Sequence, residues 1–342
     1  VAKASGSIDS IVNMGMYYIS PEYFPVGIFV IASFLSFATG TSVGTIMTLS
    51  PIVFNLAFES HSDTALIGAA LLCGAMFGDN LSLISDTTIA ATQSLGCKMS
   101  DKMKTNAQIA LPIALLSAVI LFFIGNPGAT TFTHSEAYHT FNPLLILPYV
   151  AVVVISLFGV NVFVSLFLGV VFSGVMGFSY NKFSFLEFTQ HTYKGFMDMA
   201  DIFFLYFIIG GLAFLVERFG GIQFLMNLVA KRIKSGASAL LGMGFLVTVA
   251  DVCVANNTVA ILIVSKISKR IAEQFQIPLR NAASVLDIFS CYAQGLIPYG
   301  AQVIALYQFA HTMDYLSLVG YSVYLHLLLI ATLVYIKVRG KV

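Results

Sequence analysis

Long apolar runs, separated by short polar stretches, are the feature that most constrains this chain. Residues 111–125 read LPIALLSAVILFFIG and residues 327–336 read LLLIATLVYI. Apolar residues make up 58% of the sequence and charged residues 10%, against about 45–50% and about 25% in soluble domains. A helix needs about 20 apolar residues to cross a bilayer. The sequence therefore predicts an all-α polytopic membrane protein, one transmembrane domain over residues 1–342 with roughly eight to eleven crossings.

Charged or Pro/Gly/Asn-rich stretches divide the chain into expected helices. The runs are too long, and too poor in alternation, for transmembrane strands. Most Lys and Arg residues fall into four clusters, which we assign to the cytoplasmic side together with the C-terminus. The expected location is a bacterial inner (plasma) membrane. The helices are expected at 22–58, 64–95, 107–125, 143–158, 161–178, 201–217, 237–265, 283–310 and 316–336, and the basic clusters are Lys98/Lys102/Lys104, Arg218/Lys231/Arg232/Lys234, Lys266/Lys269/Arg270/Arg280 and Lys337/Arg339/Lys341. Lys182 and Lys194 are exceptions, in a 20-residue loop that this topology places outside.

Four aspartates lie inside apolar segments: Asp79, Asp86, Asp251 and Asp287. Their three segments contain no Lys or Arg. A charged side chain at the bilayer centre costs about 2.5–3.5 kcal/mol on insertion scales, so these acids need cations, protons or water as partners. Bound Na⁺ or H⁺ would supply them. The alternative is structural: each Asp is protonated or caps a helix break, and Asp86 fits this best, because Ser85 and Asp86 precede two threonines as an N-cap would.

Two clusters of hydroxyls, amides and glycines accompany these acids. The first, TGTSVGT at 39–45, contains Thr41 and Ser42, and the second, VANNT at 254–258, contains Asn257 and Thr258. Gly and Pro break helices, and broken backbone at membrane depth is tolerated where it is buried in protein or lines a water-filled site. Unwound carbonyls and side-chain oxygens there could replace the water shell of Na⁺. The alternative is close helix packing through small residues.

The two halves of the chain share an order of features. GDNLS at 78–82 matches LDIFS at 286–290, which aligns Asp79 with Asp287 and Ser82 with Ser290, and a polar hairpin candidate precedes each motif. The charge-based topology opens the two hairpins from opposite sides. We therefore expect an inverted-repeat secondary transporter with two re-entrant hairpins and two broken helices, its repeats covering about 20–178 and 200–342.

Three stretches resemble the NhaC-type Na⁺/H⁺ antiporter family of the ion-transporter superfamily. They are TGTSVGTIMTLSPI at 39–52, GDNLSLISDTT at 78–88 and SVLDIFSCYAQGLIPYG at 284–300. The resemblance covers about residues 20–310 and implies exchange of Na⁺ for H⁺. It also implies ion-site roles for Asp79, Ser82, Ser85, Asp86, Thr87, Thr41, Ser42 and Gly44 in the first half, and for Asp287, Ser290 and Pro298 in the second.

The chain also departs from the family pattern. Leu83 stands where the family usually has Pro, PYG at 298–300 replaces a Pro-Trp-Asn sequence, and Asp251 stands alone where relatives often carry two acids. Some members move amino acids or organic acids, so these differences bear on the substrate. Members usually have further helices ahead of the first hairpin, and the chain begins with Val1, as a fragment or processed form would.

The leading hypothesis is secondary active Na⁺/H⁺ exchange by alternating access, with Na⁺ bound at Asp79 and Asp287. The alternative is Na⁺-coupled transport of an amino acid or organic acid. An aspartate-dyad enzyme is disfavoured, because seven residues of helix separate Asp79 from Asp86 by about 10 Å; a channel would not require titrating acids. The candidate ion-binding residues are Asp79, Asp287, Asp86, Asp251, Thr41, Ser42, Asn80, Ser82, Ser85, Asn257, Thr258 and Ser290, and the candidates for an organic substrate are Tyr292, Gln294, Tyr299 and Gln302.

The expected partners follow from composition. The lipid bilayer, Na⁺ and H⁺ are the partners of such a chain, and no other cofactor is expected. A net charge of +1 provides no basic arm for nucleic acid. The sequence leaves the oligomeric state open, with a homodimer among the options.

Overall fold

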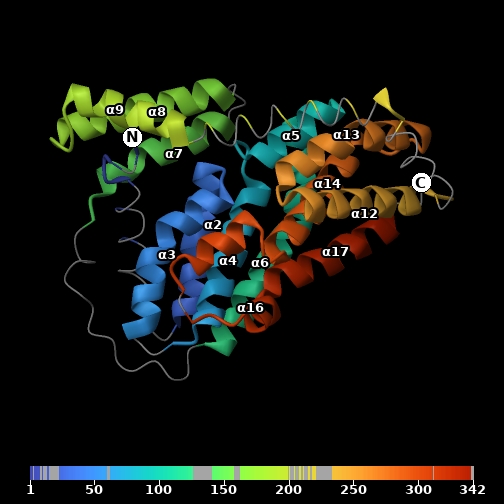
Figure 1. Ribbon diagram of the computed structural model, residues 1–342, viewed down its shortest axis with the longest axis horizontal. Helices are drawn as coiled ribbons and strands as arrows, with labels where there is room; N and C mark the ends of the chain where they lie inside the picture. The colour runs from blue at the N-terminus through green and yellow to red at the C-terminus, as the bar shows by residue number, and fades with distance from the viewer. Residues whose placement is uncertain are drawn as a thin grey trace.

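The computed structural model describes residues 23–59, 62–125, 141–157, 162–198, 233–310 and 312–339, with scattered residues in 1–14 and 200–220. These residues form helices and no strands, which confirms the all-α prediction (Figure 1). The expected helix at 201–217 and the connection between the expected helices at 107–125 and 143–158 lie largely outside the described residues. The helices are α2 Phe24–Thr39, α3 Ser42–Glu59, α4 Thr64–Leu81, α5 Asp86–Leu95, α6 Met99–Ile124, α7 Pro143–Leu157, α8 Val162–Ser179, α9 Phe185–Asp198, α12 Gly236–Val254, α13 Asn257–Gln274, α14 Leu279–Leu296, α15 Ala301–Tyr307, α16 Tyr315–Tyr321 and α17 Val323–Arg339.

Three spans of the described chain are long and apolar enough to cross a membrane. They are Thr64–Leu95, Met99–Ile124 and Gly236–Val254, and α16 with α17, bent by 51° at their junction, would make a fourth. In the apolar 18-residue window of the first span, 89% is buried inside the protein, against 28% in that of the second. The described part of the chain thus supports a membrane protein with α4 largely buried and with fewer full-length spans than the sequence predicts.

The first polar cluster forms a turn between two helices. α2 ends at Gly40, whose φ of 68° is the left-handed conformation that glycine adopts at helix C-termini, and α3 begins two residues later at Ser42. A Cβ built on Gly40 would lie 2.8 Å from the carbonyl oxygen of Ile84, in the link between α4 and α5. The α2–α3 turn therefore packs directly against the break in the next helix pair.

Two glycines bring α4 against α2. A Cβ on Gly74 would lie 2.4 Å from the carbonyl oxygen of Phe29, and one on Gly78 would lie 2.3 Å from that of Ser33. Neither distance is physically acceptable, so only glycine permits this approach of the two backbones. This packing positions the carboxyl end of α4, where Asp79 lies.

The two expected acidic helices are broken. Residues 82–85 separate α4 from α5, and residues 297–300 separate α14 from α15. The second polar cluster is also a break: Ala255, with a φ of 51°, ends α12, and the side chain of Asn256 caps α13 by accepting from Val259 N. Each half of the described chain therefore contains a helix pair joined by a polar turn, followed by a broken acidic helix.

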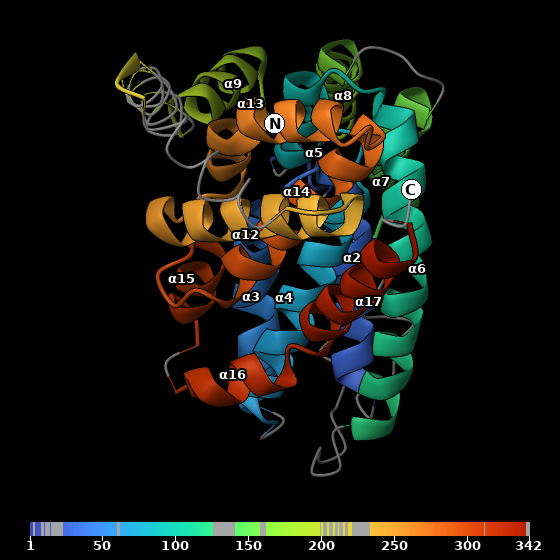
Figure 2. The same ribbon diagram turned by 90° about the vertical axis from the view of Figure 1, so that its right-hand side faces the viewer.

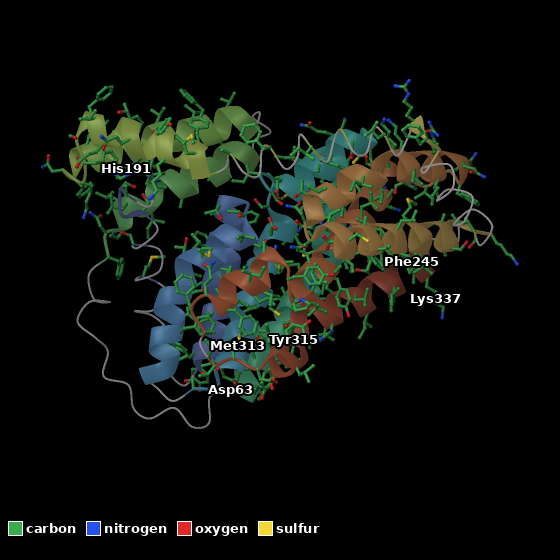
Figure 3. All side chains as sticks on the ribbon, viewed as in Figure 1. Asp63, His191, Phe245, Met313, Tyr315 and Lys337 are labelled. Carbon is green, nitrogen blue, oxygen red and sulfur yellow. The ribbon has the colours of Figure 1, made fainter. Side chains whose placement is uncertain are left out.

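The stretch expected as an outer loop contains a helix. α9 packs back on α8 through aromatic rings, with Phe178 and Phe183 at 5.4 Å and Phe178 and Phe188 at 5.5 Å between centroids. The two helices lie beside α7 at one side of the molecule (Figure 1). Figure 2 shows α12 running across the long direction of α6. Side chains such as Phe245 on α12 point outward (Figure 3), as expected for a surface covered by lipid.

Candidate functional site

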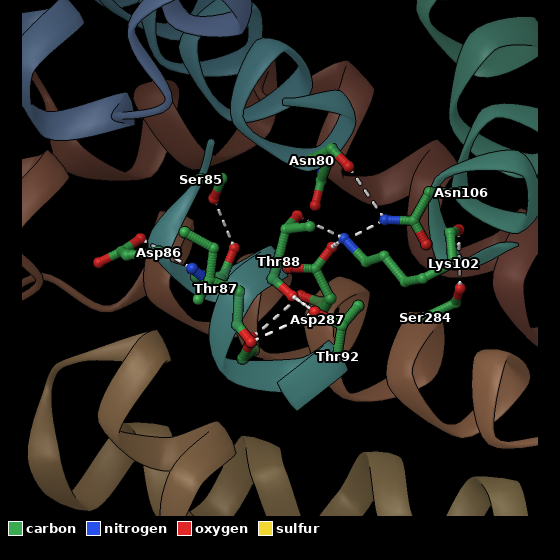
Figure 4. A network of polar contacts seen from close by, with 12 residues as sticks. Asn80, Ser85, Asp86, Thr87, Thr88, Thr92, Lys102, Asn106, Ser284 and Asp287 are labelled. Carbon is green, nitrogen blue, oxygen red and sulfur yellow. Dashed lines mark hydrogen bonds and ion pairs between the residues drawn. The ribbon is translucent and has the colours of Figure 1, made fainter. Parts of the chain in front are cut away.

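A buried ion pair joins the two halves of the chain (Figure 4). Lys102 Nζ lies 2.7 Å from Asp287 Oδ2, and both side chains are 1% exposed. Lys102 also donates to Thr88 Oγ1 of α5 at 2.7 Å, and Asn106 donates to the same Asp287 oxygen at 2.8 Å. A buried carboxylate is tolerated when it is paired and hydrogen-bonded in this way. Asp287 on α14 is therefore neutralised by a residue of the protein itself.

This pair corrects the sequence analysis in two respects. Lys102 does not lie in a basic cytoplasmic loop, since it occupies the first turn of α6 and is fully buried, while Lys104 two residues on is exposed. The carboxylate of Asp287 does have a cationic partner, which comes from outside its own segment. The sequence did carry a signal: Lys102, Asn106, Ile109 and Ala110 are buried at helical spacing, so the apolar face of α6 extends back through Lys102.

Asn106 connects this ion pair to the end of α4. Its Nδ2 donates to the main-chain oxygen of Asn80 at 3.0 Å as well as to Asp287. That oxygen belongs to the last turn of α4, where carbonyls lack partners within the helix. The side chain of Asn80 donates to the hydroxyl of the buried Tyr324 at 3.2 Å. Asn106 was not identified from the sequence, although it holds both broken helices.

Asp79 lies one residue before this point, in a different environment. Its side chain is 4% exposed, and its Oδ2 accepts a hydrogen bond from Ser42 Oγ at 3.0 Å. Its Oδ1 is buried without a hydrogen bond. Within the described part of the chain, no Lys, Arg or His pairs with Asp79. The carboxylate is therefore held by one oxygen, and its charge has no counter-ion from the protein there.

A chain of hydrogen bonds runs from Ser42 to the break in the second half. Gln302 on α15 donates to Ser42 Oγ at 3.1 Å, and Gln294 on α14 donates to Gln302 Oε1 at 3.0 Å. Gln294 also donates to the carbonyl oxygen of Ala255 at 3.1 Å. All four side chains from Gln294 to Asp79 are buried. This chain of hydrogen bonds thus joins polar groups that lie in or near all four helix breaks. The breaks are at residues 40–41, 82–85, 255–256 and 297–300.

The break between α4 and α5 holds three more predicted residues. Ser82 donates to the carbonyl oxygen of Phe37 at 2.8 Å, which ties the break to α2. Ser85, rather than Asp86, occupies the N-cap position of α5, and its hydroxyl lies 2.9 Å from that of Thr87. Asp86 is the first residue of α5, is exposed, and accepts from Thr87 N at 2.9 Å. A carboxylate at a helix N-terminus is stabilised by the helix dipole, which supports the structural reading of Asp86.

The second break contains buried oxygens without hydrogen-bond partners, among them those of Asp251. This residue lies in the last turn of α12, is 0% exposed, and has two carboxylate oxygens without hydrogen-bond partners. The hydroxyl of Thr258 is likewise buried without a partner, and Asn257 accepts from Thr258 N at 3.0 Å. Asp251 therefore resembles Asp79 in lacking a counter-ion from the described residues.

The other predicted residues make local contacts. Thr41 is exposed and accepts from Gly44 N at 3.2 Å. Ser290 donates back to the carbonyl oxygen of Asp287 at 3.0 Å. Tyr292 packs edge-on against His326 with 6.2 Å between ring centroids, and Tyr299, 50% exposed, donates to the carbonyl oxygen of Val252 at 2.8 Å. None of these four contacts reaches Asp79.

A model of the Na⁺/H⁺ antiporter family matches residues 1–126 and 133–338. The chain belongs to the Na⁺/H⁺ antiporter family. The resemblance that the sequence motifs indicated is therefore confirmed. The family is one of transporters and not of enzymes, and it agrees with the apolar helices in indicating a membrane protein.

Individual relatives match parts of the chain. The malate-2H⁺/Na⁺-lactate antiporter of Bacillus subtilis is 24% identical over 326 residues, which are 86% of this chain and 69% of that protein. The Na⁺/H⁺ antiporter NhaC of Alkalihalophilus pseudofirmus is 30% identical over 129 residues, 38% of this chain and 28% of that protein. The NhaC protein of Bacillus subtilis is 22% identical over 263 residues, 68% of this chain and 57% of that protein. The chain thus spans less than two thirds of both NhaC relatives.

Proposed function

We propose that this chain exchanges Na⁺ for H⁺ across the plasma membrane by alternating access, with Asp79 binding the two ions in turn. The observation that carries the proposal is the contrast between two buried aspartates. Each carboxylate leaves its Oδ1 without a hydrogen bond, but Lys102 neutralises Asp287, whereas Asp79 has no counter-ion among the described residues. A buried carboxylate in that condition favours neutralisation by a small cation. Na⁺ or H⁺ satisfies this need, and only one of them binds at a time.

The arrangement of the breaks supports alternating access. Each half of the described chain contains a helix pair with a polar turn, followed by a broken acidic helix. Discontinuous helices that meet at a central site are typical of transporters built from inverted repeats. We propose that the α2–α3 and α12–α13 pairs are the two re-entrant hairpins. Entry from opposite faces, and a cytoplasmic C-terminus, remain predictions.

Asp287 takes a supporting role in this proposal. Its ion pair with Lys102 joins α14 to α6, and Asn106 extends that contact to the end of α4 beside Asp79. Na⁺ at Asp287 would have to bind a carboxylate whose charge Lys102 already neutralises through a 2.7 Å contact with Oδ2. We therefore place the exchanged ion at Asp79 first, with Asp251 as the second candidate.

Carriage of an organic acid is the second candidate function. It is favoured by the match of 86% of the chain to the malate-2H⁺/Na⁺-lactate antiporter. Of the side chains predicted for such a substrate, however, Gln294 and Gln302 bond to one another, and Tyr299 bonds to the main chain. Lys102, a buried lysine of the described chain, already forms an ion pair with Asp287. Because these side chains already bond within the protein, inorganic ion exchange is favoured over carriage of an organic acid.

Flux through reconstituted vesicles tests the proposal. Proteoliposomes with an entrapped pH dye should change internal pH when Na⁺ is added outside, and the Asp79→Asn variant should show no Na⁺-dependent change at equal protein content. Glu187→Gln, on the exposed helix α9, is the control and should exchange as the unchanged protein does. Labelled malate and lactate in the same vesicles test the second candidate. Na⁺-dependent pH change by Asp79→Asn at the normal rate would contradict the role of Asp79.

A further inference from the structure

The hydrogen-bond chain that ends on Asp79 has a defined direction. It begins at the carbonyl oxygen of Ala255, which can only accept, so Gln294 must present its amide nitrogen there. The same nitrogen contacts Gln302, which must then present its amide oxygen. The nitrogen of Gln302 is left to donate to Ser42. Each amide orientation thus follows from the group before it.

These amide orientations also fix the direction in which the hydroxyl of Ser42 donates. A serine hydroxyl has one hydrogen to donate, and its oxygen already accepts from Gln302. The hydrogen therefore points to Asp79 Oδ2, at 3.0 Å. One carboxylate oxygen of Asp79 is thus occupied by a donor, and Oδ1 is left for the transported ion.

We propose that Gln302, supported by Gln294, is a positioning residue that orients Ser42 toward Asp79 and so sets the affinity of the site for Na⁺. The inference rests on the proposed function of Asp79 and adds two residues to it. A donor fixed on Oδ2 stabilises the ionised carboxylate that Na⁺ requires. Without Gln302, the Ser42 hydroxyl gains other orientations, and the ionised carboxylate loses part of this stabilisation.

This role differs from the two obvious alternatives for a buried glutamine. A ligand of an organic substrate would need open polar atoms, but both polar atoms of Gln302 are bonded within the protein. A residue that only fills space would act independently of Ser42. The structure instead predicts that the effects of Gln302 and Ser42 on Na⁺ affinity are coupled.

The test compares the KM for Na⁺ with the maximal exchange rate in proteoliposomes. Gln302→Met keeps the length of the side chain and removes the donor, so we expect the KM to rise about tenfold, as for loss of one hydrogen bond, with the maximal rate within about twofold. Gln294→Met should shift the KM in the same direction by less. Gln308→Met changes an exposed residue six positions further along the chain and should leave both constants unchanged.

A double-variant cycle decides whether Gln302 acts through Ser42. Ser42→Ala should also raise the KM, and the pair Ser42→Ala/Gln302→Met should match Ser42→Ala alone within about twofold. Multiplicative effects, or an unchanged KM in Gln302→Met, would overturn the inference while leaving Asp79 in place.

Na⁺ binding by the purified protein provides a readout that needs no transport. The Na⁺ concentration that half-maximally raises the thermal midpoint should shift in Gln302→Met by the same factor as the KM. If the unchanged protein binds Na⁺ but does not exchange it, this shift alone supports the positioning role, and the proposed function fails separately. If the unchanged protein does not bind Na⁺ at all, both fail.

Discussion

Lys102 of α6 and Asp287 of α14 form an ion pair 2.7 Å long between residues 185 positions apart. Thr88 and Asn106 add hydrogen bonds to the pair, so α5, α6 and α14 meet at one point (Figure 4). The pair lies beside the last turn of α4, which carries Asp79. The charge balance of the interior therefore depends on two helices that are distant in the sequence.

Removing one partner of this pair should destabilise the protein strongly. Lys102→Met leaves the carboxylate of Asp287 buried without its cation, and loss of one partner of a buried pair costs about 3–5 kcal/mol. The thermal midpoint in detergent, followed by circular dichroism, should fall clearly. Lys104→Met, at an exposed position in the same helix turn, is the matched control and should change little.

The double variant Lys102→Met/Asp287→Leu should be more stable than Lys102→Met alone. Replacing both charges by apolar groups removes the uncompensated carboxylate. If the double variant is less stable than either single variant, the two residues do not act as an ion pair.

Alanine at Gly78 should separate α2 from α4. The added Cβ would lie 2.3 Å from the carbonyl oxygen of Ser33, which belongs to rigid helix backbone, and overpacking of this kind costs about 1–3 kcal/mol. We expect a lower thermal midpoint and a weaker affinity for Na⁺, because Asp79 follows Gly78 directly. Gly195→Ala in α9 is the control, since its Cβ would meet nothing within 4 Å. An unchanged midpoint in Gly78→Ala would contradict the close packing.

Acid should loosen the start of α9. The main-chain N–H and then the hydroxyl of Ser184 donate to the carboxylate of Glu187, at 2.7 and 2.9 Å, and they hold its pKa below the ordinary value. A lowered pKa in the folded state stabilises that state above the pKa of the unfolded chain. This contribution disappears as the pH falls through the folded-state pKa.

Amide hydrogen exchange measures this effect. After correction for the intrinsic pH dependence of exchange, the first-turn amides of α9 should lose protection between about pH 5 and pH 3. Glu187→Gln should abolish the pH dependence of that protection, because glutamine does not titrate. A pH dependence that persists in Glu187→Gln would assign the effect to another group.

The sequence could predict the helix breaks because they depend on local chemistry. Gly40 is required by its left-handed conformation, and Asn256 caps the following helix with its own side chain. Both effects operate within a few residues, so the clusters at 39–45 and 254–258 identified the turns correctly. The expected N-cap was displaced by one residue, from Asp86 to Ser85, which is within the usual uncertainty of a helix end.

Sequence alone thus determined the helical membrane class, the family and three of the four aspartates as buried, while Asp86 is exposed. It could do so because hydrophobicity and helix-breaking residues act locally along the chain. The tertiary structure decided which aspartate is neutralised. Lys102 looked like a loop residue because its neighbours in sequence are polar, and only the packing of α6 against α14 reveals its partner. The path from Gln294 to Asp79 likewise joins residues on separate helices, and hydrogen-bond direction becomes defined only when those groups are brought into contact.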